Sequence, residues 1–371
     1  MRNFLSIVIT ALIIPFTNNN KINAQGCVAI RGNASTCMLS HPEHTNKAGW
    51  QLSTSARYFK SFRHFSGTVE NKDRLAQGTE VINHSATLDL ALTRIFNDRW
   101  SLTIDAPIIS NTRSSLYEHG LVNGAYIKKE RHSTHSFGLG DVRVAVYRWL
   151  LDPVKNMKGN IQLGLGIKLP TGDYNYQDYW YNVGLNRAKE LRTVDQSIQL
   201  GDGGTGFTVE ANTFYNFKKN FGVYGNFYYL VNPREQNGVR TYRETLSPAL
   251  GNEAIMSVPD QYMARGGFNY SCNTIKGLSL AAGARLEGIP VHDLIGSSGD
   301  FRRPGYVWSI EPSVNYSIKK VNLFASVPFA IVRNRTQSVT DKENSAKTGK
   351  FVRGDAAFAN YTINAGVALR F

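Results

Sequence analysis

The chain alternates apolar and polar residues with a period of two over most of its length, which is the pattern of β-strands whose two faces meet different surroundings. Twelve segments of about ten to fifteen residues show this pattern. They are residues 49–62, 83–96, 99–109, 137–150, 160–169, 206–217, 221–232, 259–272, 277–288, 305–318, 321–334 and 357–371.

The connections between these segments alternate in length. Short connections such as "ND" and "KK" follow the even-numbered segments, and polar loops of 16 to 36 residues follow the odd-numbered ones. A soluble β-sandwich has no reason to place every long loop at one end. A transmembrane β-barrel has short turns at one end and long loops at the other, with an even number of strands. The pattern therefore predicts an all-β fold, a twelve-stranded antiparallel barrel with short periplasmic turns and long extracellular loops.

The two faces of the predicted strands agree with a barrel in a membrane. In the second segment Leu88, Leu90 and Leu92 share one face, and Thr87 and Asp89 share the other. An apolar outside and a polar inside suit a closed sheet in lipid, where every backbone group needs a partner within the sheet. Closure also explains why alternation continues through the final stretch "NYTINAGVALRF", since a last strand that pairs with the first cannot fray.

Aromatic residues recur at the short-turn ends of the segments, where an interfacial girdle is expected. They are Trp50, Trp100, Trp149, Phe217, Phe221 and Phe371. The alternative interpretation, a secreted soluble β-protein, accounts for the alternation but not for these aromatic positions.

The amino terminus predicts export. Arg2 precedes an apolar run and a small-residue site that ends at Ala24, so residues 1–24 are expected to be a signal peptide. Residues 25–48 are then an N-terminal periplasmic or luminal segment, and Cys27 and Cys37 within it are expected to form a disulfide. Lipid attachment at Cys27 is the alternative, but the residues before it lack the expected aliphatic side chain. Residues 49–371 are the predicted barrel, in the outer membrane of a Gram-negative bacterium.

The formal net charge of +14 points to an anionic partner. Because an exported chain rarely meets nucleic acid, outer-membrane lipid and lipopolysaccharide are the expected partners. Two basic stretches are candidates for lipopolysaccharide phosphates, although both would also serve solubility. Their residues are Lys128, Lys129, Arg131, Arg302 and Arg303.

Three glycine-rich stretches carry a resemblance to a known family. They are "FGLGDVRVAVYRWL", "GLGIKLPTGDYN" and "LGDGGTGFTVEANTFYNF", between residues 137 and 217. Together they resemble the outer-membrane channel family named for the MetA pathway of phenol degradation, which is also similar to amyloid-exporting barrel channels. The resemblance implies a barrel that passes molecules across the outer membrane. The long Tyr-rich loop after residue 169 and the Cys27/Cys37 pair depart from the family pattern, so no cargo is carried over.

The motif residues also have a physical interpretation of their own. Glycines at 138, 140, 164 and 166 remove side-chain bulk and permit curvature, and Pro170 ends a strand at the barrel rim.

Enzymatic chemistry has little support in the sequence. His84 and Ser85 are adjacent in a predicted strand and therefore point to opposite faces, and no Gly-x-Ser-x-Gly motif appears. The histidine pairs His41/His44 and His132/His135 lack a third ligand at a useful spacing, so no metal site and no cofactor is expected.

Two groups of residues are candidate sites. The first is an aromatic cluster in the loop "GDYNYQDYWYN", suited either to binding a solute or to packing the loop on itself: Tyr174, Tyr176, Tyr179, Trp180 and Tyr181. The second is a set of inward-facing charges that would line a pore and act as a selectivity filter, or brace the wall by ion pairing: Asp89, Asp105, Asp141, Arg143, Lys168, Arg265, Arg285, Glu287 and Glu311.

The sequence therefore predicts an outer-membrane channel or transporter for small or slender solutes. Twelve strands enclose a lumen between that of filled eight-stranded barrels and that of open sixteen-stranded porins. A narrow lumen of this kind is expected to be selective, or to depend on a periplasmic partner protein that opens it. The main alternative is a non-transporting surface barrel, either an adhesion module or an anchor. An outer-membrane lipase is the weaker one.

Overall fold

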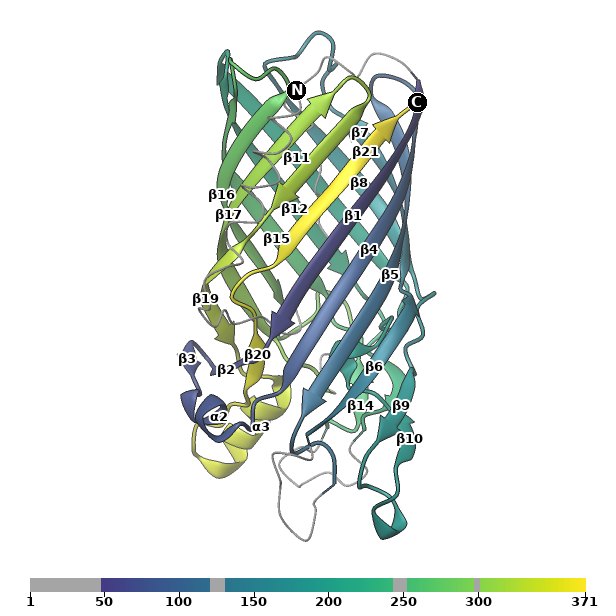
Figure 1. The fold of residues 1–371 in the computed structure, drawn as a ribbon, viewed down its shortest axis with the longest axis vertical. Coiled ribbons are helices and arrows are strands. Elements are labelled where there is room, and N and C mark those ends of the chain that lie inside the picture. Colours follow the sequence, from purple (N-terminus) through teal and green to yellow (C-terminus); the bar gives the residue numbers. More distant parts are fainter. Residues whose placement is uncertain (1–47, 121–130, 243–251, 297–300) are drawn as a thin grey trace, which may run out of the picture.

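The computed structural model describes residues 48–120, 131–242, 252–296 and 301–371. In this part of the chain, antiparallel strands form one closed barrel (Figure 1). Its strands are β1 (Gly49–Ser61), β4 (Ile82–Ile95), β5 (Trp100–Ser115), β6 (His132–Leu139), β7 (Val142–Trp149), β8 (Gly159–Leu169), β11 (Gly206–Lys218), β12 (Phe221–Val231), β15 (Gln261–Ser271), β16 (Leu278–Ile289), β17 (Gly305–Ile318), β18 (Val321–Ser326), β19 (Phe329–Arg335) and β21 (Ile363–Arg370).

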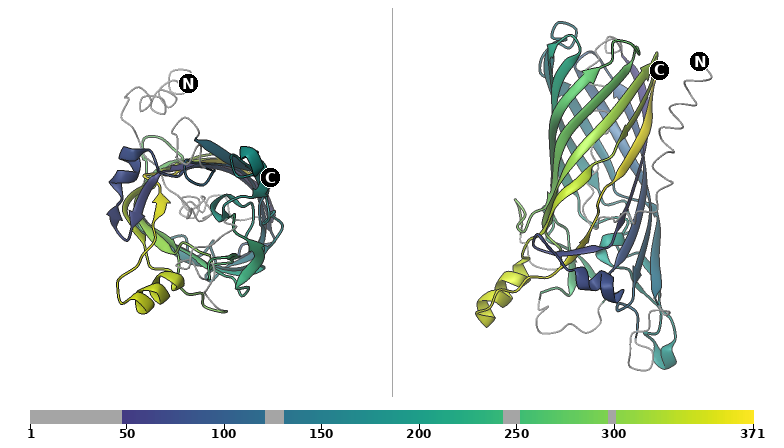
Figure 2. Two further views of the ribbon diagram at one scale, coloured as in Figure 1. Left: turned by 90° about the horizontal axis from the view of Figure 1, so that it is seen from below. Right: turned by 60° about the vertical axis from the view of Figure 1, so that its left-hand side comes forward.

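These strands occupy twelve positions around the described barrel, because β6 and β7 share one position beside β5, and β18 and β19 share one beside β17. The last strand pairs with the first, in a register that places Leu52 opposite Leu369 and Tyr58 opposite Ile363. Seen along the axis, the strands form a closed ring (Figure 2). The predicted twelve-stranded antiparallel barrel is confirmed.

Three predicted segments are shorter or broken in the structure. Residues 137–150 divide at Gly140 and Asp141, and residues 321–334 divide at Val327 and Pro328, where proline offers no amide to the sheet. The final segment joins the barrel only from Ile363, since Ala356–Phe358 (β20) leaves the wall and pairs with Arg63–Ser66 (β2).

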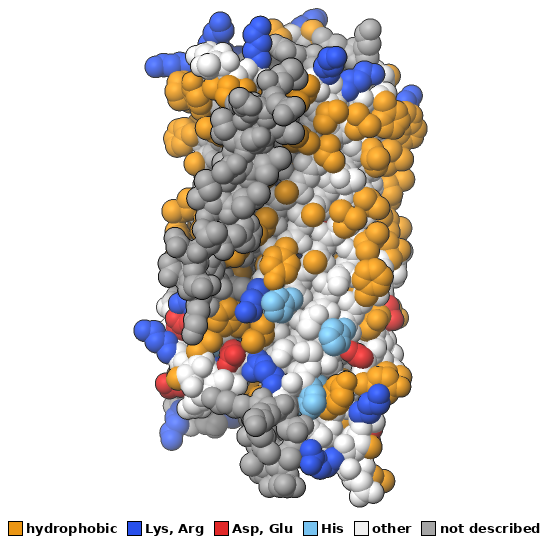
Figure 3. All heavy atoms as spheres, in the orientation of Figure 1, with side chains coloured by type: hydrophobic (Ala, Val, Ile, Leu, Met, Phe, Trp, Pro, Cys, Tyr) orange, Lys and Arg blue, Asp and Glu red, His pale blue; other side chains and the backbone are white. Residues whose placement is uncertain are grey.

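The outer surface carries an apolar belt, visible in Figure 3 as hydrophobic side chains along the wall. Outward residues such as Ile104, Leu165 and Phe268 are exposed, as residues that face lipid should be. Five of the predicted girdle aromatics are exposed at the short-turn end. Trp149 is an exception: it alternates in phase with the inward residues and packs edge-on against the buried Phe214, so its inclusion in the girdle is wrong.

The long loops carry further elements at the opposite end of the barrel (Figure 1). They are β2 (Arg63–Ser66), β3 (Val69–Glu70), α2 (Lys72–Gln77), β9 (Gln177–Trp180), η5 (Leu185–Arg187), β10 (Glu190–Thr193), η6 (Gln196–Ile198), β13 (Gln236–Arg240), β14 (Ile255–Ser257), α3 (Val339–Thr348) and β20 (Ala356–Phe358). A small apolar cluster of Phe65, Val307, Ala356 and Phe358 fixes the β20–β2–β3 sheet to the barrel rim.

The predicted signal peptide, the segment 25–48 apart from its last residue, and the Cys27–Cys37 disulfide lie outside the described residues and stay predictions. In the described ranges, no helix has the length and apolar character needed to cross a membrane.

Candidate functional site

The loop between β8 and β11 returns through the barrel interior before it reaches β11. Ile198 on η6 is buried, and its carbonyl oxygen accepts hydrogen bonds from Asn111 of β5 (3.3 Å) and Ser136 of β6 (2.5 Å). Asp195, at the start of η6, is fully buried. Its carboxylate accepts hydrogen bonds from the two terminal guanidinium nitrogens of Arg303, at 3.1 and 3.0 Å. Loop segments within the ring are visible in Figure 2. The inward segment is therefore anchored to the wall by both hydrogen bonds and ion pairs.

A second anchor is built from the glycine-rich motifs, which meet around one carboxylate. Asp141 accepts hydrogen bonds from the backbone N–H of Gly172 (3.0 Å) and of Asp202 (3.3 Å). Lys168 pairs with both Asp141, at 3.5 Å, and Asp202. We call this group, with Gly201, the Asp141 junction.

The glycines of the junction are required by close backbone approach. A Cβ on Gly172 would lie 2.6 Å from the carbonyl oxygen of Leu200, and one on Gly201 would lie 2.5 Å from Oδ1 of Asp141. Any side chain there would push the two loop arms apart and remove the amides from the carboxylate. The glycine-rich motif is thus explained by the docking of the inward segment onto the wall.

A second charged group lies next to the junction on the same wall. Arg143 is opposite Asp105 on β5 and opposite Lys168 on β8. Its guanidinium pairs with Glu210 and lies 3.6 Å from Asp105, and it sits 5.7 Å above the ring of Tyr228. Tyr147 also donates to Glu210, at 3.0 Å. We call this the Arg143 group.

A third charged group lies further around the barrel. Arg265 pairs with Glu311 at 3.0 Å, and Arg285 pairs with Glu287 at 2.7 Å and with Glu311 at 3.8 Å. All four side chains are nearly buried. Eight of the nine inward charges named from the sequence, all except Asp89, therefore lie in these ion-pair networks.

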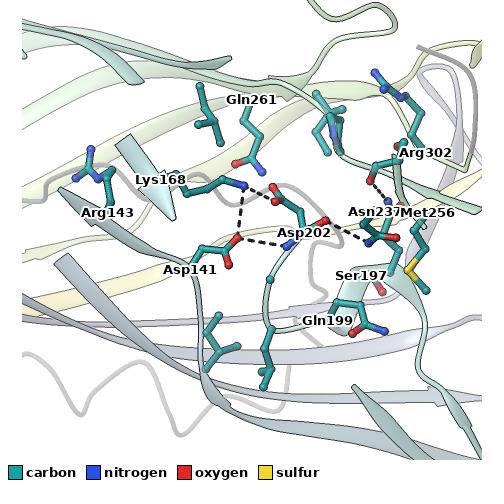
Figure 4. Close-up of a pocket in the computed structure, with 18 of the residues that line it drawn as sticks. Asp141, Arg143, Lys168, Ser197, Gln199, Asp202, Asn237, Met256, Gln261 and Arg302 are labelled. Atoms are coloured by element: carbon teal, nitrogen blue, oxygen red, sulfur yellow. Dashed lines mark hydrogen bonds and ion pairs between the residues drawn. The ribbon is translucent and has the colours of Figure 1, made fainter. Parts of the chain in front are cut away.

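A cavity of about 260 Å³ lies inside the barrel between the inward segment and the wall (Figure 4). Of the nine predicted pore-lining residues, four line it: Asp105, Asp141, Arg143 and Lys168. Asp89 and the four residues of the third group face the lumen from strands of the wall but do not line this cavity. The selectivity role of all nine stays a prediction.

Several residues of the site were missed as candidates from the sequence. Asp202 lies in the quoted "LGDGG" stretch, and Glu210 alternates in phase with inward residues, so both carried a signal. Asp195 and Met256 lie outside the predicted strands, and no sequence pattern indicates that their side chains are buried in the interior. Arg113 lies on β5 beyond the end of the predicted segment and is 3.5 Å from Asp195.

The aromatic loop residues divide into two sets. Trp180 is only 1% exposed and stacks on Tyr242 (ring centroids 4.6 Å apart), while Tyr181 stacks on His132 (4.2 Å). These contacts pack the loop on itself. Tyr179 is exposed beneath the Lys189 ammonium, and Tyr174 and Tyr176 are half-buried. Solute binding by this cluster stays a prediction, and the ring of Trp180 is already covered.

The basic residues expected at lipopolysaccharide are differently placed. Lys128 and Lys129 lie outside the described residues. Arg302 and Arg303 face the cavity and form ion pairs with Asp293 and Asp195, so their assignment to a surface lipid site is wrong. Arg131 binds backbone carbonyls of the neighbouring loop, Gly78 and Glu80.

The described residues contain no group of three or more histidine, cysteine or acidic side chains placed to hold a metal ion. His132 is instead stacked on Tyr181, and His135 pairs with Asp178 at 3.2 Å. The pair His41/His44 lies outside the described ranges.

The part of the chain that contains the Asp141 junction matches a known family. Residues 106–245 match the model of a family described as "Putative MetA-pathway of phenol degradation". The resemblance predicted from the glycine-rich motifs is confirmed. The matched region contains the whole junction, the inward segment and β12.

A solved structure shares the architecture. An outer-membrane channel of the COG4313 type from Pseudomonas putida F1 is 12% identical, with a TM-score of 0.54 over 89% of this chain and 99% of that chain. The translocator domain of the autotransporter NalP from Neisseria meningitidis scores 0.43 at 11% identity (91% and 93% covered). The toluene transporter TodX from P. putida scores 0.40 at 10% identity (93% and 95% covered). No relative among curated proteins matches the sequence.

Proposed function

We propose that this protein is an outer-membrane channel that passes small solutes through the barrel lumen. The observation that carries the proposal is the closed barrel with an apolar outer wall and a charged, cavity-bearing interior. The shared fold with a protein described as an outer-membrane channel, and the family match, support the same proposal.

We place the protein in the outer membrane of a Gram-negative bacterium, with the short turns on the periplasmic side. Lipid and lipopolysaccharide would then surround the wall, and a small molecule would be the cargo. The apolar belt and the long loops at one end support this orientation. Dependence on a periplasmic partner protein stays a hypothesis.

We also propose that the barrel transports and does not catalyse. His84 precedes Ser85 in the sequence and shares a hydrogen bond with the hydroxyl of Tyr58 at 2.8 Å. His135 pairs with Asp178 and precedes Ser136, but His135 is exposed, whereas the Ser136 hydroxyl is buried and donates to the carbonyl of Ile198. A nucleophilic serine needs a histidine that is oriented by an acid. A lipase assay on the detergent-solubilised barrel tests this directly, and ester hydrolysis above background would overturn it.

A non-transporting barrel is the second candidate, favoured by one observation. The inward segment and the wall bury each other so well that Ile198, Thr134 and Ser136 are each about 1% exposed. Conductance in planar bilayers separates the two functions. Discrete steps at any voltage support the channel, and a purified barrel that assembles but never conducts supports the anchor.

We propose that the Arg143 group and the Asp141 junction set the ion preference of the channel. Replacing Arg143 by Met should move the reversal potential in a salt gradient toward cation preference, because Asp105 and Glu210 lose their shared cation. An unchanged reversal potential with a less stable barrel would show that these residues only brace the wall.

A further inference from the structure

Charged and apolar side chains both line the cavity. The charged ones are of both signs and come from β5, β7 and β8, from Asp202 of the inward segment, and from Arg57, Arg302 and Arg303. Apolar ones include Tyr228, Leu230, Met256 and Ile289. Tyr228 and Leu230 belong to a packed cluster with Met263, so their positions are fixed. A ligand that fills the cavity therefore needs an apolar body and a charged end.

The charged part of the lining holds cations and carboxylates close together. Lys168 bridges Asp141 and Asp202, with Gln261 beside them in Figure 4, and Arg143 lies next along the wall, between Asp105 and Glu210. A hydrocarbon placed here would remove water from these ions without offering them any hydrogen bond or opposite charge, which is unfavourable. A solute with one charge would satisfy ions of one sign and face repulsion from the other. A zwitterion can pair with both signs at once.

The volume limits the size of the ligand. About 260 Å³ is below the range typical of sites for drug-sized ligands. It suits one ring or a short branched chain that carries its charged groups on a single carbon. The ring of such a ligand would lie against Leu230, Met256 and Ile289, since the Tyr228 ring already contacts the Arg143 guanidinium.

We propose that the cavity binds a small zwitterion with an apolar side chain, of the class of the α-amino acids, during passage through the barrel. The inference rests on the proposed channel function. In this proposal the ammonium of the ligand pairs with Asp105 and Asp202, its carboxylate pairs with Arg143 and Lys168, and its side chain packs against Leu230, Met256 and Ile289, all of which line the cavity.

Liposome swelling with a matched solute set tests the proposal. Phenylalanine carries both charges, phenethylamine lacks the carboxylate, 3-phenylpropanoate lacks the amine, and alanine lacks the ring. We expect phenylalanine to enter about tenfold faster than either singly charged analogue and to interrupt ionic current in planar bilayers, as one charge-assisted contact implies. Equal entry of phenylalanine and a singly charged analogue overturns the inference.

Two substitutions test whether the cavity residues cause the preference for phenylalanine. Asp105→Asn should slow phenylalanine but not 3-phenylpropanoate, since only the first has an ammonium. Leu230→Ala should reduce the preference for phenylalanine over alanine. Glu343→Gln on α3, outside the barrel, is the matched control and should change neither ratio. Heat-dependent gel mobility verifies that each variant assembles. The comparison of the four solutes in the wild-type barrel tests the proposal even if a variant fails to assemble.

The outcomes distinguish the two proposals. If ions pass but the four solutes enter without preference, the zwitterion site is refuted and the channel stands. If the assembled wild-type barrel passes neither ions nor solutes, the channel function is refuted, and the zwitterion inference falls with it.

Discussion

Removal of Arg143 should destabilise the barrel, because two buried carboxylates depend on it. Its guanidinium is shared by Glu210 and Asp105, and the three side chains are 9%, 6% and 9% exposed. Replacing Arg143 by Met keeps most of the side-chain volume but leaves two carboxylates buried without their cation. Removing one partner of a buried ion pair costs about 3–5 kcal/mol of unfolding free energy, and we expect a loss in this range.

A second substitution separates the contribution of charge to the stability loss from the contribution of packing. Glu210→Gln in the Arg143→Met background removes one of the two uncompensated charges, and Tyr147 can still donate to the amide oxygen. The double variant should therefore recover about half of the loss, roughly 2 kcal/mol. If packing alone explained the loss, the second substitution would recover nothing.

The matched control is Arg148→Met on the same strand. Arg148 is exposed and lies over the Trp100 ring at 5.1 Å, an exposed cation–π contact worth about 0.5–1 kcal/mol. Denaturant unfolding of the lipid-reconstituted barrel, followed by tryptophan fluorescence, measures all three variants. An Arg143→Met barrel within about 1 kcal/mol of the wild type would refute the role of Arg143 as the cation that Asp105 and Glu210 require.

Three further outcomes are expected. A peptide tag after Leu185, which is 89% exposed, should be labelled on intact cells while one after Asn273 should not; the reverse labelling would invert the topology. Burial acts to raise the pKa of Asp195, but Arg113 and Arg303 outweigh this effect and hold the pKa well below its ordinary value. Asp195→Asn should therefore loosen the inward segment and raise single-channel conductance. Acidification from pH 7 to 4 should not act through Asp195, because its carboxylate stays ionised. Burial, with His132 nearby, lowers the pKa of His119 to about 4, so the unfolded loop binds a proton first and the packing around Trp180 should weaken as pH falls from about 6.5 to 4. Acrylamide quenching of the Trp180 fluorescence, identified as the part of the signal that Trp180→Phe removes, measures this weakening. A His119→Asn variant whose quenching has the same pH profile as the wild type would contradict the role of His119.

The wall of the barrel could be predicted because its signal is local. Each strand shows its inward and outward faces in consecutive residues, and each turn shows its length, so the positions of β1, β8 and β17 follow within a few residues. The error at Trp149 had a signal of the same kind, since its spacing from Arg143 and Tyr147 places it inside. The inward faces of Asp105 and Glu210 also follow from phase alone.

The interior of the barrel could not be predicted in the same way. Asn237 shows the difficulty: it follows a strand and reads as an exposed loop residue, yet it is 5% exposed and donates to the carbonyl of Asp202. Arg303 likewise reads as a surface cation and is an ion-pair partner of Asp195. Such contacts join residues far apart in the chain through irregular backbone, and no period in the sequence reports them.

The glycine-rich motifs and the charged lumen are two consequences of one constraint. A loop that returns through a narrow barrel needs its backbone polar groups satisfied by the wall, because little water can reach them. Asp141 supplies acceptors for two loop amides, and glycines at 172 and 201 allow the backbone to come close enough. The buried carboxylate in turn needs a cation, which Lys168 provides. The charges around the cavity are therefore part of what holds the loop inside, and a solute that binds there must exchange with ion pairs that also keep the inward segment in place.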